Sequence, residues 1–396
     1  MMIRNRQILS RISPENSPRR PALPLPKPSA LLAANRSIAG MVLAASLLFG
    51  CKRPEQTPAP EPPTATIQSG NEAPEARFGP GPEPASLPAP SGRSPAFSLK
   101  PSAKNAAPAP YEIWKEFSGD KAFAEARSQV EIGPRPSGSP EIEKARALIE
   151  KSLKASGWDI ERQVFTNETP HGHVEFVNLV GRFSASEKHP APDNTQKAIV
   201  CSHYDTKKFS TIRFVGASDG ASSTGALLEL ARVLALDPVL ASKVELAFFD
   251  GEEAVVQFTS PEDSHPDGLY GSRYYAVKLR ASSRASQFKF GILWDMIGAR
   301  DLTITLPPNS PPDLSRDIMA AADALQLRNR FTVFDRDILD DHWPLIHIAH
   351  VPTIDLIDFD YPVWHTADDD LDHIGPESLR QVGAVTLYHL RKALGR

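Results

Sequence analysis

The sequence has few cysteines and no marked excess of charge of either sign, and both absences exclude classes of protein. Only two cysteines, Cys51 and Cys201, occur in 396 residues, so a secreted fold held together by a framework of disulfides is excluded. Basic and acidic residues nearly balance, with a formal net charge of −4 and a pI near 6.3. Because a nucleic-acid-binding protein usually carries a clustered basic face, no nucleic-acid partner is expected.

The phosphate-binding patterns GxGxxG and GxxxxGK[ST] are absent, and the apolar stretch nearest the N-terminus is short. That stretch, residues 37–50, falls below the ~20 residues that a membrane-spanning helix needs. It follows basic residues from Arg19 to Arg36 and ends at Cys51, which is the order of a secretory signal peptide. Residues 48–51, Leu-Phe-Gly-Cys, resemble a bacterial lipobox, in which the cysteine is lipidated and becomes the mature N-terminus.

We therefore expect residues 1–50 to be a lipoprotein signal peptide and Cys51 to be the lipidation site. The alternative is an ordinary cleaved signal peptide or a short anchor. Residues 51–110 are rich in proline, alanine, glutamate and serine, a composition that predicts a disordered tether. The protein is then expected to be lipid-anchored in the cell envelope, facing the periplasm or the exterior, and to be a monomer.

The remaining chain, residues 111–396, is predicted to be one catalytic domain with an α/β fold. Apolar runs that read as strands alternate with amphipathic patterns that read as helices, which indicates a central, mostly parallel mixed β-sheet with helices on both faces. Strands are expected near residues 159–166, 173–183, 197–202, 243–249, 288–296 and 351–357, and helices near 118–133, 140–156, 223–236, 270–281, 310–325 and 376–394.

Polar residues follow these strands where each strand ends, and in such sheets ligands bind beyond the carboxyl ends of the strands. Two histidines and four carboxylates occupy these strand-end or helix-start positions: His203, Asp219, Glu252, Glu253, Asp295 and His365. Each has an ordinary explanation when taken alone, such as a helix cap for Asp219 or a solvated turn for the two glutamates. Together, histidine and carboxylate ligands without a thiolate are typical of a catalytic zinc site with an open position.

Seven segments in order resemble the glutaminyl-peptide cyclotransferase branch of the zinc-aminopeptidase superfamily. The similarity runs from about Arg135 to Leu394 and rests on CSHYDTKKF, FVGASDGAS, FFDGEEA, DGLYGSRYYA, LWDMIGA, DDHWPL and VWHTADDDLD. It implies an α/β fold and one zinc ion held by Asp219, Glu253 and His365.

The resemblance also implies roles for the neighbouring residues. Glu252 matches the general acid/base, and Asp295 and Asp340 match two carboxylates around the substrate's amine. Further residues are expected at the substrate pocket: Trp364 as an aromatic wall, Phe258 where the branch usually has tryptophan, and Tyr361 near the mouth. The implied reaction converts the N-terminal glutamine of peptides or proteins to pyroglutamate, with release of ammonia.

Two other functions stay open. A co-catalytic aminopeptidase would hold two zinc ions, and His203 and Asp295 are present to serve the second. A lipoprotein that binds peptides on a degenerate enzyme fold is the third possibility, although such a protein has no need of a base beside a metal. The pattern around residues 267–276 and 340–342 favours the cyclotransferase.

Overall fold

The computed structural model describes residues 111–183 and 196–395. The predicted signal peptide, the lipidation site Cys51 and the tether lie outside these residues, so they stay predictions, as does the start of the domain at residue 111. Within the described ranges, none of the helices combines the length and the apolar character needed to cross a membrane.

Every predicted strand and helix is present, and several short elements are added. The strands are β1 (Trp158–Thr169), β2 (Gly172–Phe183), β3 (Lys197–His203), β4 (Val244–Phe249), β5 (Phe288–Asp295), β6 (Ile304–Leu306), β7 (Phe331–Val333) and β8 (Thr353–Ile357). The helices are α1 (Gly119–Ile132), α2 (Pro140–Ala155), α3 (Ser223–Leu234), α4 (Pro238–Ala241), α5 (Tyr270–Ala281), α6 (Pro312–Ala324), α7 (His342–His347) and α8 (Pro376–Leu394). Short 3-10 helices lie at Ile113–Glu116, Ala285–Gln287 and Arg328–Arg330, and a π-helical turn lies at Ala217–Ser222.

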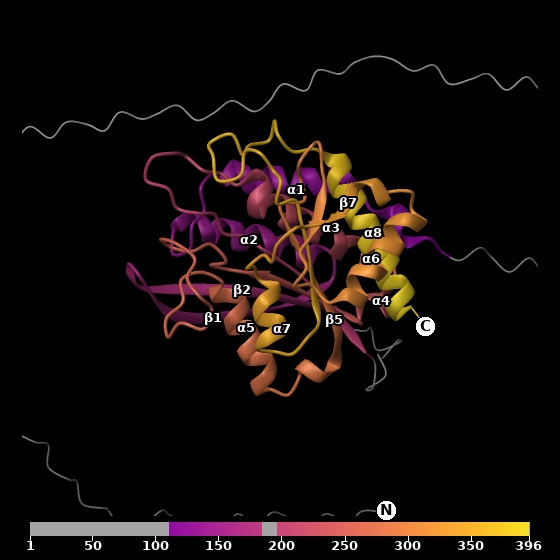
Figure 1. Cartoon of the computed structure of the whole chain (residues 1–396), viewed down its shortest axis with the longest axis horizontal. Coiled ribbons are helices and arrows are strands. Elements are labelled where there is room, and N and C mark those ends of the chain that lie inside the picture. The colour runs from indigo at the N-terminus through magenta and orange to yellow at the C-terminus, as the bar shows by residue number, and fades with distance from the viewer. Residues whose placement is uncertain (1–110, 184–195, 396) are drawn as a thin grey trace, which may run out of the picture. The chain divides into compact units, whose positions relative to one another are not determined.

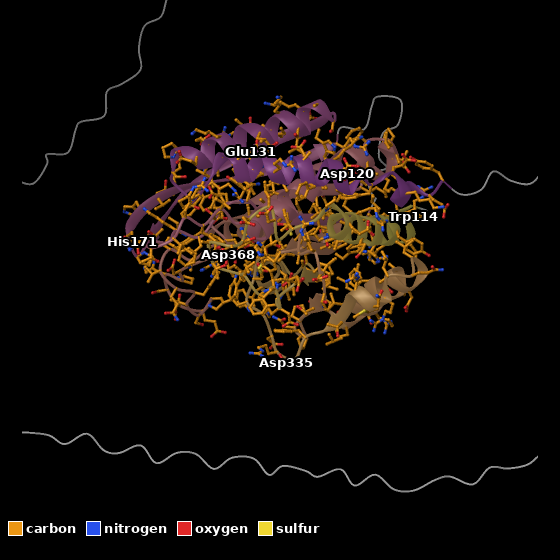
Figure 2. The ribbon with its side chains drawn as sticks, turned by 90° about the horizontal axis from the view of Figure 1, so that it is seen from above. Trp114, Asp120, Glu131, His171, Asp335 and Asp368 are labelled. Atoms are coloured by element: carbon orange, nitrogen blue, oxygen red, sulfur yellow. The ribbon has the colours of Figure 1, made fainter. Side chains whose placement is uncertain are left out.

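The main sheet has the strand order β1-β2-β4-β3-β5-β8. Strands β4, β3, β5 and β8 pair in parallel, whereas β1 and β2 form an antiparallel hairpin that pairs with β4. Figure 2 shows His171, in the turn of this hairpin, at the opposite end of the domain from Trp114. The predicted fold class is confirmed: a mixed, mostly parallel sheet.

Both faces of the sheet are buried, and side chains alternate between them along each strand as the pleat requires. In β3, Ala198 and Val200 belong to the larger core cluster, while Ile199 and Cys201 belong to the smaller one. Helices α1, α2, α3, α6 and α8 cover the first face, and α5 and α7 cover the second. Figure 1 shows α5 beside α7 in the lower half and α6 beside α8 at the right.

The two strands that follow β3 in the sequence lie on opposite sides of it in the sheet. Strand β4 pairs with one edge of β3 and strand β5 pairs with the other, so the carboxyl end of β3 is a topological switch point. Open α/β sheets bind their ligands at such a point. The ends of β3, β4, β5 and β8 are therefore where the site is expected.

A buried ion pair supports the turn that follows β4. Asp250 is fully buried; its carboxylate accepts hydrogen bonds from Arg146 Nη2 at 2.5 Å, from Ser137 Oγ at 2.6 Å and from the Val177 amide at 2.8 Å. Arg146 is itself 3 % exposed and also donates to the Tyr204 hydroxyl. The pair links α2 to the residue before Gly251.

Arg146→Ala is expected to lower the free energy of unfolding by about 3–5 kcal/mol, because it leaves the Asp250 carboxylate buried without its cation. Urea unfolding followed by circular dichroism measures the change. The control is Arg162→Ala, which removes an exposed arginine that also pairs with Glu143 and is expected to cost no more than about 1 kcal/mol. Equal losses in both variants would contradict the role of the buried pair.

Candidate active site and metal centre

The π-helical turn before α3 carries Asp219 into the site. Asp219 has non-helical dihedrals, and Gly220 follows with a φ of +90°. A side chain at Gly220 would place its Cβ 3.1 Å from Cε1 of His203, so glycine lets the turn approach the end of β3. Asp219 does not cap α3; its carboxylate faces the two histidines.

The carboxylate of Asp219 bridges two groups of ligand atoms. On one side, His203 Nε2 lies 3.2 Å from Asp219 Oδ1 and 3.1 Å from Asp295 Oδ1. On the other side, His365 Nε2 lies 3.3 Å from Asp219 Oδ2 and 3.2 Å from Glu253 Oε1. Each group offers three ligand atoms that lie within 4.8 Å of one another.

These separations fit a zinc ion. Ligand atoms about 2.0–2.1 Å from a tetrahedral zinc are about 3.3 Å apart. Oδ2 of Asp219 and Oε2 of Glu253 are buried and have no hydrogen-bond partner among the described residues. Unpaired buried carboxylate oxygens are costly unless a cation is near. The donor set of imidazole and carboxylate therefore fits the expected metal.

Electrostatics at these groups also favour a cation. Burial alone would lower the pKa of His365, but contacts with Asp219 and Glu253 overcome burial and raise it to about 9. Burial raises the pKa of Glu253 to about 7, with Asp219 adding to the rise. Burial would also raise the pKa of Asp219, yet its contacts with His203 and His365 lower it below the usual value. A bound metal would take the place of the protons that the two imidazoles hold.

The Asp-Gly-Glu-Glu turn after β4 is held by the backbone and by Asp205. Gly251 has a φ of +72°, and a Cβ there would lie 2.4 Å from the Phe176 ring, so only glycine fits. The two oxygens of Asp205 accept hydrogen bonds from the amides of Glu252 at 3.2 Å and Glu253 at 3.3 Å. One carboxylate therefore fixes the backbone of both adjacent glutamates.

The two glutamates have different surroundings although they are neighbours. Glu253 contacts His365, and Lys207 Nζ lies 3.9 Å from its other oxygen. Both glutamates line a cavity of about 250 Å³, but Glu252 has no contact of this kind with His365 or Lys207. Burial raises the pKa of Glu252 well above its usual value; His203 opposes the rise and Glu253 adds to it. Glu252 is thus free to act as an acid or base, while Glu253 is placed as a ligand.

Aromatic side chains surround His365 and line part of the cavity. The rings of Phe209 and Phe214 meet the His365 ring edge-on at centroid distances of 5.4 and 5.6 Å, and Trp364 stacks on it at 4.3 Å. His365 has a φ of +56°, a conformation that costs about 1–3 kcal/mol and is found at functional sites.

The residues expected at the substrate pocket separate into two groups. Phe258 and Trp364 line the cavity, whereas Tyr361 does not. Tyr361 is 5 % exposed, and its hydroxyl donates to Asp369 at 2.9 Å. The role of Tyr361 in substrate binding therefore stays a prediction; in the structure its hydroxyl contacts Asp369.

Asp369 is a site residue that the sequence did not single out. Its oxygens accept hydrogen bonds from the amides of Ser218 at 2.7 Å and Asp219 at 3.1 Å. The neighbouring residues 368 and 370–372 are exposed or partly exposed. Asp369 therefore orients the turn that presents the bridging carboxylate.

Asp369→Asn is expected to weaken zinc binding about 10–100-fold, which is the usual effect of removing a group that orients a metal ligand. Titration against a competing chelator measures the change. The exposed neighbour variant Asp368→Asn provides the matched control and should bind zinc as the parent does. Unchanged affinity in the Asp369 variant would show that the turn holds its shape without this carboxylate.

Comparison with known proteins agrees with this geometry. The model of peptidase family M28 matches residues 178–390, more than half of the chain. A glutaminyl-peptide cyclotransferase of Drosophila melanogaster is 31 % identical over 263 residues, covering 60 % of this chain and 71 % of the relative.

Solved structures give the same result. An Acidobacteriales bacterium glutaminyl cyclase matches with a TM-score of 0.62 and 31 % identity, covering 78 % of this chain and all of that one. A zinc-dependent exopeptidase from Parabacteroides distasonis matches with a TM-score of 0.61 and 25 % identity, over 71 % of this chain and 99 % of that one. The expected resemblance is confirmed, and the chain belongs to peptidase family M28.

Proposed function

We propose that this protein is a zinc-dependent glutaminyl-peptide cyclotransferase, which converts the N-terminal glutamine of peptides or proteins to pyroglutamate. The observation that carries the proposal is the position of Glu252. It lines the same small cavity as Asp219, Glu253 and His365 but is not itself part of that ligand group. The similarity to glutaminyl cyclases supports the same reaction.

The proposed reaction is an intramolecular acyl transfer. Glu252 takes a proton from the α-amine, the amine nitrogen forms a bond to the side-chain carbonyl carbon, and the bond from that carbon to the amide nitrogen breaks. Glu252 then returns the proton to the leaving nitrogen, so one ammonia departs. A zinc ion held by Asp219, Glu253 and His365 would supply Lewis-acid stabilisation of the charge that develops on the carbonyl oxygen.

The cavity contributes to catalysis by positioning the reacting groups. A volume of about 250 Å³ is at the small end for a ligand pocket and suits one side chain with its α-amine rather than a long peptide. Asp295 and Asp340 line it, so the α-amine of a bound residue would lie near carboxylates. Because both reacting groups belong to one residue, holding them in place accounts for a large part of the rate.

A di-zinc aminopeptidase is the second candidate, and one specific observation favours it. The two oxygens of Asp219 face two separate ligand groups, and all three residues of the group of His203, Asp219 and Asp295 are buried. Such a bridging carboxylate is what a co-catalytic pair of metals needs. The similarity to a zinc-dependent exopeptidase supports this candidate as well.

Two peptides distinguish the candidates. The zinc-loaded protein is incubated with Gln-Ala and with Leu-Ala, and the products are identified by mass spectrometry. Loss of one ammonia from Gln-Ala, with Leu-Ala intact, is the expected result. Release of free leucine would instead establish the aminopeptidase, and two unchanged peptides would reject both enzymes in favour of a peptide-binding protein.

We further propose that the protein is anchored to the cell envelope by a lipid on Cys51. The proposal rests on the basic, apolar and Leu-Phe-Gly-Cys order of residues 19–51. Cys51→Ser is expected to move the protein from the membrane fraction to the soluble fraction, with Cys201→Ser as the control because Cys201 is buried inside the domain. Membrane retention of the Cys51 variant would contradict lipid anchoring.

A further inference from the structure

A second group of buried polar side chains lies beside the catalytic cavity. We call Asp340, His342 and Asp355 the α7 cluster. Asp340 lies two residues before His342, the first residue of α7, and Asp355 lies in β8, which packs against α7. Relative exposures are 3 % for Asp340 and 0 % for the other two. None of the three belongs to the ligand groups that contain Asp219.

The α7 cluster is short of hydrogen-bond donors. Neither ring nitrogen of His342 has a hydrogen-bond partner among the described residues. The carboxyl groups of Asp340 and Asp355 contact each other, but Asp355 and Oδ2 of Asp340 have no other partner there. Asp340 Oδ1 accepts a hydrogen bond from the amide of Asp341 at 2.5 Å. Burying polar atoms without hydrogen-bond partners is costly, so a bound ion or a water molecule is expected among them.

The geometry selects a cation over a shared proton. Nδ1 of His342 lies 3.5 Å from Oδ2 of Asp355, which is longer than the 2.7–3.2 Å of an N–H···O hydrogen bond. It is close to the separation of about 3.3 Å between two ligands of a tetrahedral metal. One ligand atom from each of the three residues lies within 4.8 Å of the others. A proton shared by the two carboxylates would leave both nitrogens of His342 without a partner.

We propose that Asp340, His342 and Asp355 form a second, structural site for a divalent transition metal ion, which shares no ligand with the groups that contain Asp219. One imidazole and two carboxylates, without a thiolate, suit zinc or manganese. Calcium and magnesium prefer oxygen ligands alone. Both ring nitrogens of His342 lack a hydrogen-bond partner among the described residues, so either one can bind a metal.

The position of this site indicates that the metal would stabilise the local structure. It would join the start of α7 to the middle of β8 and fix Asp340, whose side chain lines the catalytic cavity with Ile338 and Leu339. The segment before α7 is a loop from Phe334 to Asp341 with no helix or strand of its own. A metal at the α7 cluster would thus hold one wall of the cavity in place.

Metal content tests the proposal directly. The full-length chain and the variants Asp355→Asn and His347→Gln are loaded with zinc, dialysed, and analysed by inductively coupled plasma mass spectrometry. Asp355→Asn keeps the shape of the side chain and is expected to lose one equivalent of zinc. His347 lies on the same short helix but is exposed, and its variant should keep the full amount.

Equal zinc content in the parent and the folded Asp355→Asn variant would overturn the proposal. If that variant does not fold, anomalous diffraction at the zinc edge from crystals of the parent chain decides the matter. A peak between His342 and Asp355 is expected, and its absence overturns the site. Failure of the cyclase assay does not affect either readout, so the proposed reaction and this site are tested independently.

Discussion

Glu252→Gln is expected to lower the rate of pyroglutamate formation by about 10²–10⁴-fold, the usual contribution of a general acid/base. The reason is local: Glu252 lines the cavity but does not belong to the ligand groups, so its removal takes away the proton carrier and leaves the metal ligands in place. Initial rates on Gln-Ala, together with zinc content, measure both effects.

The control for this experiment is Glu262→Gln, which neutralises an exposed carboxylate in the loop that follows the same turn. It should leave both rate and zinc content unchanged. A near-normal rate in the Glu252 variant would remove this residue from the mechanism. A simultaneous loss of zinc would show instead that Glu252 is a ligand and that the roles of the adjacent glutamates need to be exchanged.

Asp219→Asn is expected to lose the catalytic metal and to reduce activity by several orders of magnitude. Both oxygens of Asp219 are used, one toward His203 and one toward His365, so the loss of its negative charge affects both ligand groups at once. Zinc content and isothermal titration with zinc measure the effect on binding. Asp368→Asn again serves as the exposed control.

The structural site proposed at the α7 cluster adds an expected zinc stoichiometry to the prediction for Asp219→Asn. The Asp219 variant should still retain one equivalent of zinc there, because the α7 cluster shares no ligand with Asp219. Zinc bound at full parental stoichiometry in the Asp219 variant would refute its assignment as a ligand.

The strands and long helices were predictable because their local signals agree with the fold. Each strand is an apolar run, and Ser139 caps α2 with Pro140 as its first residue, as the sequence indicated. The same logic placed His203, Glu253 and Asp295 at one edge, since the carboxyl ends of parallel strands meet there. The short helix α7 gave no such signal: it has six residues, with Pro344 inside it, too few for a helical period to show.

The orienting residues were not predictable for a different reason. Asp369 belongs to an acidic stretch, residues 368–370, in which every residue is the same type. Only the tertiary fold decides that the middle one turns inward to the amides of Ser218 and Asp219. Asp205 posed the same problem, because nothing local connects it to amides that lie 47 and 48 residues later in the chain. Contacts of this kind depend on the path of the backbone in space rather than on a pattern.

The bridging position of Asp219 has a consequence for the life of the protein. Its partners come from the end of β3, the end of β4, the end of β5 and the loop after β8, so no fragment that ends before residue 365 contains the full set. A metal therefore binds the folded protein at this site and not the unfolded chain. Free zinc at about 100 times its dissociation constant would add about 2.7 kcal/mol to the free energy of unfolding. Metal starvation would thus expose the protein to proteolysis as well as stopping its chemistry.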